Sequence, residues 1–172
     1  MTKKHTMDVE HDRVFPLRKI VSGGQTGVDR AALDLSLYLG ISIGGWCPKG
    51  RLAEDGPIPP SYPLKETPSS KASQRTEWNV RDADGTLILT DRSATGGTAL
   101  TIRFAKQHQK PFLIVRLDKN PDEEVALNWI TQHHIQTLNV AGPRASTDPR
   151  IYQMAYGFLQ ELLQRRGAPP CP

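Results

Sequence analysis

Two kinds of hydrophobic pattern alternate along this chain. Short apolar runs are followed by longer segments in which apolar positions recur every three or four residues. Short runs are typical of buried strands, and the longer segments are typical of helices that cover them. Strands are predicted at residues 19–22, 41–46, 86–90, 112–115 and 136–141. This alternation of strand and helix favours a parallel sheet with helices on both faces.

The first helical segment shows the pattern most clearly. Val28, Ala32, Leu35 and Leu39 form one apolar stripe, and Gly40 is a good helix stop. Asn120 and Asp148 are residue types that often cap the start of a helix, and each is followed by a proline, which is common at the first helical position. Further helices are predicted over 70–81, over 97–109, after Asn120-Pro121 and after Asp148-Pro149.

These elements predict one α/β domain over residues 18–164, Rossmann-like, with three layers and a mainly parallel sheet of about five or more strands. The length of 172 residues, with 37% hydrophobic and 23% charged residues, suits a globular protein. Residues 1–17 and 165–172 have no periodicity, so we expect flexible tails there.

Charge and cysteine content narrow the classes of partner. The net charge is +4, but no dense basic stripe with interleaved aromatics is present, so no nucleic-acid partner is expected. Cys47 and Cys171 match neither a disulfide framework nor the spacing of a metal site. No apolar stretch approaches the roughly 20 residues of a membrane span, and the chain start lacks the apolar core of a signal peptide. We therefore expect a cytoplasmic protein without a membrane partner.

Two glycine-rich turns carry the functional signal. Residues 22–27 (Ser-Gly-Gly-Gln-Thr-Gly) follow the first predicted strand, and residues 93–98 (Ser-Ala-Thr-Gly-Gly-Thr) follow the third. Such turns expose backbone N–H groups beside the positive end of a helix, where anions bind. Both turns belong to the carboxyl edge of the sheet, where ligands bind in such folds. They predict one pocket for a phosphate-bearing ligand, with candidate donors Gly23, Gly24, Gln25, Thr26, Gly27, Thr95, Gly96, Gly97 and Thr98.

Each turn also has a purely structural interpretation. The first lacks both the Lys-Ser/Thr pair of a P-loop and the glycine spacing of the dinucleotide fingerprint, so it is also read as a tight turn that needs positive φ angles. The second is also read as a helix start capped by Thr95. Asp29, in the first turn of the next helix, either binds a ribose hydroxyl, a metal or a neighbouring arginine, or simply favours the helix dipole.

Arg75 and Arg144 are the candidate charge partners of the ligand. Arginine suits bidentate recognition of phosphate, and Arg144 follows the last predicted strand, at the same edge. Arg75 is equally compatible with a surface ion pair with Glu77. Residues 47–68 contain six prolines and predict a long loop without regular structure, a lid or pocket wall. Cys47, at its start, has nearby cations but no base in reach, which disfavours a nucleophile.

Four segments resemble a known family. They are residues 22–32, 45–56, 75–80 and 139–144, and the likeness covers about residues 19–160. The chain resembles the family named "putative molybdenum carrier", a circularly permuted branch of the SLOG superfamily of Rossmann-like nucleotide-binding proteins. The resemblance implies a phosphate-bearing, nucleotide-like ligand, with the molybdenum cofactor or a nucleotide as the candidate cofactor. It also implies a homodimer or higher oligomer, as relatives form.

Among the relatives are LOG-type enzymes, which release a base from nucleoside 5′-monophosphates. They carry Arg-Lys on a helix, an Asp nine residues after that Arg, and then Pro-Gly-Gly-x-Gly-Thr-x-x-Glu. By this resemblance Arg75 fits the arginine, Asp84 the aspartate and Gly97-Thr98 the Gly-Thr pair, whereas the place of the glutamate falls on Thr101. Glycosidic cleavage needs a carboxylate beside the sugar, so this departure weakens the expectation of an enzyme.

Three functions are therefore compared. The leading hypothesis is a carrier or sensor that binds a nucleotide- or pterin-type phosphate ligand. The second is a nucleotide N-glycoside hydrolase, with Arg75, Glu77 and Asp84 as the weak catalytic candidates. The third is a protein-interaction domain whose pocket is a relic.

Overall fold

The computed structural model describes residues 16–165, and these residues form the predicted α/β fold. Five parallel strands make one sheet in the order β2-β1-β9-β7-β8. The strands are β1 (Lys19–Val21), β2 (Ser42–Gly44), β7 (Gly85–Thr90), β8 (Phe112–Arg116) and β9 (Thr137–Ala141). The predicted tails lie outside the described residues except at 16–17 and 165, and Leu17 is buried in the core.

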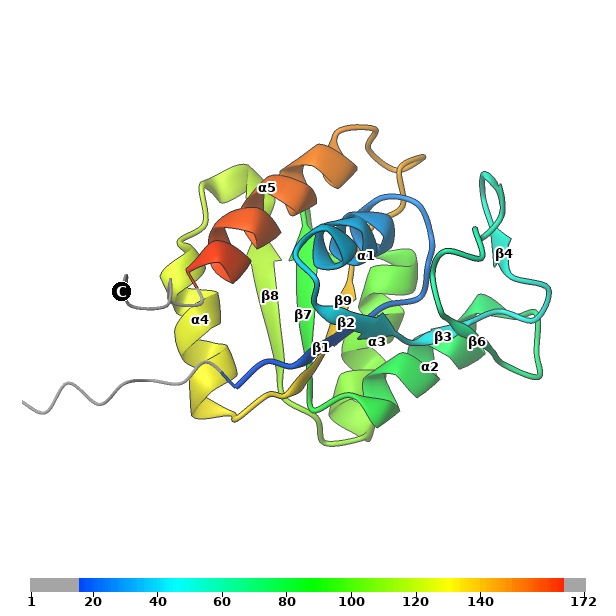
Figure 1. The fold of residues 1–172 in the computed structure, drawn as a ribbon, viewed down its shortest axis with the longest axis horizontal. Coiled ribbons are helices and arrows are strands. Elements are labelled where there is room, and N and C mark those ends of the chain that lie inside the picture. Colours follow the sequence, from blue (N-terminus) through cyan, green and yellow to red (C-terminus); the bar gives the residue numbers. More distant parts are fainter. Residues whose placement is uncertain (1–15, 166–172) are drawn as a thin grey trace, which may run out of the picture.

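Helices cover both faces of the sheet, as predicted (Figure 1). Helices α1 (Val28–Tyr38), α4 (Glu123–Gln132) and α5 (Ile151–Gln164) lie on one face. Helices α2 (Ala72–Asp82) and α3 (Gly96–Gln107) pack together on the other, and η1 (Leu117–Lys119) is a short 3-10 turn after β8. Every helix among residues 16–165 is too short or too polar to cross a bilayer.

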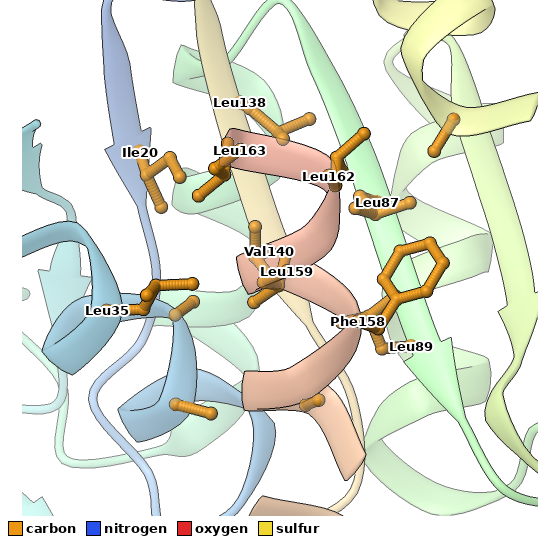
Figure 2. Close-up of a cluster of buried hydrophobic side chains, with 14 of the residues drawn as sticks. Ile20, Leu35, Leu87, Leu89, Leu138, Val140, Phe158, Leu159, Leu162 and Leu163 are labelled. Carbon is orange, nitrogen blue, oxygen red and sulfur yellow. The ribbon is translucent and has the colours of Figure 1, made fainter. Parts of the chain in front are cut away.

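The main core lies between the sheet and the layer of α1 and α5. Figure 2 shows leucines of α5 and α1 packed against strand residues. Leu159 and Leu162 are fully buried, as are Leu87 and Leu138 beneath them. Since burying such a side chain contributes about 1.5–3 kcal/mol, the apolar stripe of α5 fixes this helix to the sheet.

The order of the strands creates a crevice at one edge. From β1 the chain passes through α1 to β2, toward one side of the sheet, and from β7 it passes through α3 to β8, toward the other side. Strand β9 lies between β1 and β7. The turns after β1 and β7 therefore leave on opposite faces, which is the arrangement that opens a ligand crevice at the carboxyl ends of parallel strands.

The second predicted strand is shorter in the structure than its apolar run predicts. It ends at Gly44, because the chain turns at Gly45, whose φ is +124°. A Cβ atom at Gly45 would lie 2.4 Å from the carbonyl oxygen of Ser22, so only glycine fits there. Beyond it, β3 (Trp46–Cys47) leaves the sheet and pairs with β6 (Lys65–Glu66).

Both proline-marked helix starts are displaced by two residues. Asn120 adopts a left-handed conformation with φ 45°, and Asp122 is the residue that caps α4 through a bond from the amide of Glu124. At α5 the N-cap is Arg150, whose amide donates to the carboxylate of Asp148. The signals therefore indicate that a helix begins nearby, but the predicted first residues of both helices are wrong by two positions.

The proline-rich segment has more regular structure than predicted. Besides β3 and β6 it holds a hairpin of β4 (Leu52–Ala53) and β5 (Gly56–Pro57). A second small core anchors the segment to α1 and consists of Leu33, Cys47, Ile58, Tyr62 and Leu64. The segment lies beside the sheet in Figure 1, at the β2 side of the molecule.

Candidate functional site

A cavity of about 180 Å³ opens at the carboxyl edge of the sheet. It is bounded by the turn after β7, the loop after β9, the start of α2 and one residue of the turn after β1. Seven of the predicted ligand-binding residues line it together: Gln25, Arg75, Thr95, Gly96, Gly97, Thr98 and Arg144. The structure thus brings parts of both glycine-rich turns and both candidate arginines to one place.

The turn after β7 offers unused hydrogen-bond donors. Gly96 has a φ of +52°, and a Cβ atom at Gly96 or Gly97 would meet nothing within 4 Å. Within residues 16–165, no protein acceptor takes the amides of Gly96 and Gly97, whereas the amide of Thr98 already donates to the carbonyl of Thr95. The Thr95 side chain makes no capping bond. Unpaired amides at a helix start are suited to an anion.

Arg75 lines the same cavity with donors of its own. One guanidinium nitrogen, Nη1, lies 3.2 Å from Oδ2 of Asp29. The Nε atom is buried and has no hydrogen-bond partner. An unsatisfied buried donor costs about 1–3 kcal/mol. Glu77 pairs with His108, and the Arg75 side chain is only 16% exposed, so Arg75 does not lie on a solvated helix face with a surface ion pair.

Asp29 is the buried counter-charge of this arginine. Only 3% of the residue is exposed, and its carboxylate accepts from the amide of Gln25 as well as from Arg75. Burial raises the pKa of Asp29, although the nearby Arg75 charge and the Gln25 amide act in the opposite direction. Of the interpretations open in the sequence, the structure contains the neighbouring arginine, and Asp29 also lies in the first turn of α1, where a helix dipole favours an acid.

Gly23 leaves the space that this ion pair needs. A Cβ atom there would lie 2.0 Å from Nη1 of Arg75 and 2.9 Å from Oδ2 of Asp29. At these distances something must shift, and the atoms nearest to such a Cβ belong to the end of the Arg75 side chain. Gly23 therefore serves the site by letting Arg75 lie against the turn after β1.

Three other residues of the first turn do not reach the cavity. Gly24, with φ +78°, packs against Leu64 and Ile58, and Gly27, with φ +80°, lies against the loop after β9. The Thr26 hydroxyl donates to Glu54 and accepts from the amide of Ala145. This part of the turn therefore joins elements of the protein and offers no donor to the cavity.

Glu54 ties the proline-rich segment to the loops around the cavity. Its carboxylate accepts from the Ser146 amide at 3.0 Å and from the Ser146 hydroxyl at 2.6 Å, in addition to Thr26. Burial raises the pKa of Glu54, but these hydrogen bonds outweigh it and hold the pKa below its ordinary value. No residue of 47–68 lines the cavity, so the predicted pocket wall supports the site from outside.

The structure adds an arginine that the sequence pattern did not single out. Arg92 lines the cavity and pairs with Asp91 at 2.5 Å and Asp148 at 3.7 Å. Arg92 directly precedes the second glycine-rich turn in the sequence, and this position could have indicated that it lies at the site. Arg144, by comparison, lies at the rim with 55% of its side chain exposed, 3.9 Å from Glu54.

Two catalytic candidates lie away from the cavity. Glu77 pairs with Nε2 of His108 at 3.0 Å, where α2 meets α3. Asp84 precedes β7 and accepts from the amides of Gln136 and Thr137, at the amino end of the sheet.

Cys47 is buried, and burial raises the pKa of its thiol. Among residues 16–165, no group of three or more His, Cys, Asp or Glu side chains is placed to hold a metal ion.

A parallel sheet lies between two layers of helices, and the cavity lies at the carboxyl ends of the strands, where the direction of the chain connections reverses. This arrangement places the protein among Rossmann-like α/β proteins. Residues 20–163 match the family described as the Circularly permutated YpsA SLOG family, and the chain belongs to this family. The chain is also similar to a crystal structure of a protein named "Putative molybdenum carrier protein" from Syntrophus aciditrophicus SB. The two are 52% identical over 86% of this chain and 96% of that one, with a TM-score of 0.83. No curated protein matches the chain. The family resemblance inferred from the sequence is thereby confirmed.

Proposed function

We propose that this protein binds a phosphate-bearing small molecule of nucleotide or pterin type, as a carrier or sensor. The phosphate occupies the cavity between the turn after β7 and Arg75. The protein from Syntrophus aciditrophicus carries the name of a molybdenum carrier, and a pterin phosphate is the part of a molybdenum cofactor that such a site would hold.

The observation that supports this most strongly is the unpaired donor set. The Nε atom of Arg75 is buried without a partner, and the Gly96 and Gly97 amides in the same cavity are free among the described residues. Guanidinium and helix-start amides are the groups that proteins use to hold phosphate. An anion in the cavity would accept from the two amides and would lie beside the positive charge of Arg75.

Binding without catalysis is favoured by the carboxyl groups near the cavity. Glycoside hydrolysis generally uses two carboxyl groups beside the sugar. Among the described residues, Asp29 is the single acid that lines the cavity, and Arg75 and the Gln25 amide already engage it. Asp84 and Glu77, which the LOG pattern brought forward, bond elsewhere.

Calorimetry with AMP and inorganic phosphate tests the proposal on Gly97→Asp. A Cβ atom at position 97 meets nothing within 4 Å, so the variant should fold, and because Gly97 lines the cavity we expect the added carboxylate to lie near the free amides. Repulsion between like charges should weaken AMP binding by about tenfold or more.

Gly97→Asn is the matched control, because it has nearly the same shape without the charge. We expect it to bind AMP clearly better than Gly97→Asp does. Equal affinity in the two variants, or no binding of AMP or phosphate to the unmodified protein, contradicts the proposal. Release of adenine from AMP, followed by chromatography, would replace the carrier with the hydrolase.

A further inference from the structure

The cavity has an unusual lining for a site that binds a ring system. Its described lining residues supply hydroxyl, amide, carboxylate and guanidinium groups, and they include no aromatic side chain. Ala141 and Pro143 are the lining residues with wholly apolar side chains. Pockets for small organic molecules are predominantly hydrophobic and aromatic, and stacking on an aromatic side chain contributes about 1–3 kcal/mol per base. That contribution has no source in this cavity.

The size of the cavity points the same way. Its volume of about 180 Å³ lies below the range of roughly 300–1,000 Å³ found for pockets that enclose whole drug-sized ligands. A nucleotide or pterin phosphate therefore enters with only part of its structure. The charged part is the one that the free amides and Arg75 attract.

Free hydroxyl groups line the remainder of the cavity. Within residues 16–165, four hydroxyls that line it bond to no protein group: Ser93, Thr95, Thr98 and Thr147. The hydroxyls of Thr76, Thr90 and Thr101 differ, since each donates to a backbone carbonyl. A free hydroxyl both donates and accepts, so it pairs equally well with the hydroxyls of a sugar.

From these observations we infer that the site recognises a sugar phosphate and leaves the base outside the cavity. The ligand class is a pentose phosphate and its derivatives, with phosphate on the Gly96 and Gly97 amides and Arg75, and sugar hydroxyls on the free serine and threonine groups. This inference rests on the proposed phosphate site. It adds that the base contributes little to affinity.

Calorimetry on the full chain with five probes tests the inference. The probes are ribose 5-phosphate, AMP, CMP, inorganic phosphate and adenosine. We expect ribose 5-phosphate, AMP and CMP to bind within about threefold of one another, because all three present the same sugar phosphate. Inorganic phosphate should bind about tenfold more weakly, since it lacks the sugar hydroxyls, and adenosine should show no binding.

The outcomes separate the two proposals. AMP binding more than about tenfold tighter than both CMP and ribose 5-phosphate means that the base is recognised, which overturns the inference and leaves the phosphate site intact. Equal affinity of inorganic phosphate and ribose 5-phosphate also overturns it. No binding by any phosphate-bearing probe removes the phosphate site itself.

A pair of substitutions locates the sugar. Thr98→Val removes a free hydroxyl and should weaken ribose 5-phosphate by about fivefold while leaving inorganic phosphate within about twofold. Thr76→Val is the matched control, because the Thr76 hydroxyl lines the same cavity but is already bonded to the Ala72 carbonyl. Equal effects of the two variants on ribose 5-phosphate overturn the assignment of the sugar to the free hydroxyls.

Discussion

At the scale of single residues, the glycines of the turn after β1 have different structural roles. Gly24 and Gly27 hold positive φ angles and pack against other parts of the protein, whereas Gly23 leaves room for Arg75. In the second turn, Gly97 faces open space. A shared residue type therefore says little until the neighbours of each glycine are known.

Gly23→Ala should damage the site through Arg75. The new methyl group would occupy the place of Nη1, so the arginine must move and Asp29 loses its buried counter-charge. We expect the free energy of unfolding to fall by about 3 kcal/mol, as for breaking a buried ion pair, and AMP binding to be lost. Chemical denaturation and calorimetry measure the two effects.

Gly157→Ala, inside α5, is the control for this substitution. A Cβ atom there meets nothing within 4 Å, so removing a helical glycine should stabilise the protein by about 0.5–1 kcal/mol and leave AMP binding unchanged. If Gly23→Ala keeps full stability and affinity, Arg75 does not hold the position described.

At the scale of elements, one arginine organises the proline-rich segment. Arg51 donates from its guanidinium to four backbone carbonyls of that segment: Ile58, Pro59, Tyr62 and Leu64. Backbone groups without a ladder partner must find another one. Arg51 supplies these partners, and the segment folds into an ordered structure although prolines prevent a regular sheet.

Arg51→Lys should loosen the segment while the sheet stays folded. An ammonium group cannot reproduce the planar fork that reaches all four carbonyls, and each hydrogen bond to a charged group contributes about 1.5–3 kcal/mol. We expect hydrogen exchange of residues 51–66 to accelerate by about tenfold or more, without a comparable change in β7.

Arg103→Lys, on the exposed face of α3, provides the comparison and should leave exchange unchanged. Uniform acceleration across the whole domain in Arg51→Lys would mean that the segment does not open independently.

At the scale of the whole molecule, one carboxylate joins three parts of the chain. Asp34 of α1 accepts from the hydroxyl of Tyr62 in the proline-rich segment at 2.5 Å and from that of Tyr152 of α5 at 2.7 Å. Burial, followed by the bond to Asp34, raises the pKa of Tyr62 to about 12, and the same causes raise the pKa of Tyr152. This contact holds the segment against the helix layer.

The contact predicts a pH dependence of stability. Because the folded-state pKa of Tyr62 lies above its ordinary value of 10, its contribution is complete below pH 10 and is lost as the pH rises toward about 12. Tyr62→Phe should lower the free energy of unfolding by about 1–2 kcal/mol at pH 8, and this difference from the unmodified protein should shrink toward pH 12. Denaturant unfolding across this pH range measures it.

Tyr38→Phe, which alters a tyrosine that is 76% exposed, should have no effect at any pH in that series. A difference between Tyr62→Phe and the unmodified protein that stays constant from pH 8 to pH 12 would contradict the role given to the Tyr62 hydroxyl.

The sequence by itself determined the fold class, the five strands of the main sheet and the helices between them, and it placed the glycine-rich turns at the edge of the sheet where the cavity lies. Helices bury one face and the central strand β7 is buried at every position, so apolar spacing and apolar runs record them locally, and the glycine-rich turns mark the ends of β1 and β7. The early end of the second strand has no such local record, because the need for glycine at position 45 comes from the distant carbonyl of Ser22, which leaves no room for a Cβ atom.

Only the tertiary structure decided which polar groups remain free for a ligand. Arg75 and Asp29 are 46 residues apart, and Thr26 is bonded to Glu54, 28 residues away. Such contacts depend on how loops converge in three dimensions, and no local period records them. Glycine therefore has a structural role at Gly24, whereas the amides of Gly96 and Gly97 stayed available, and the candidates Thr26 and Asp84 are bonded within the protein.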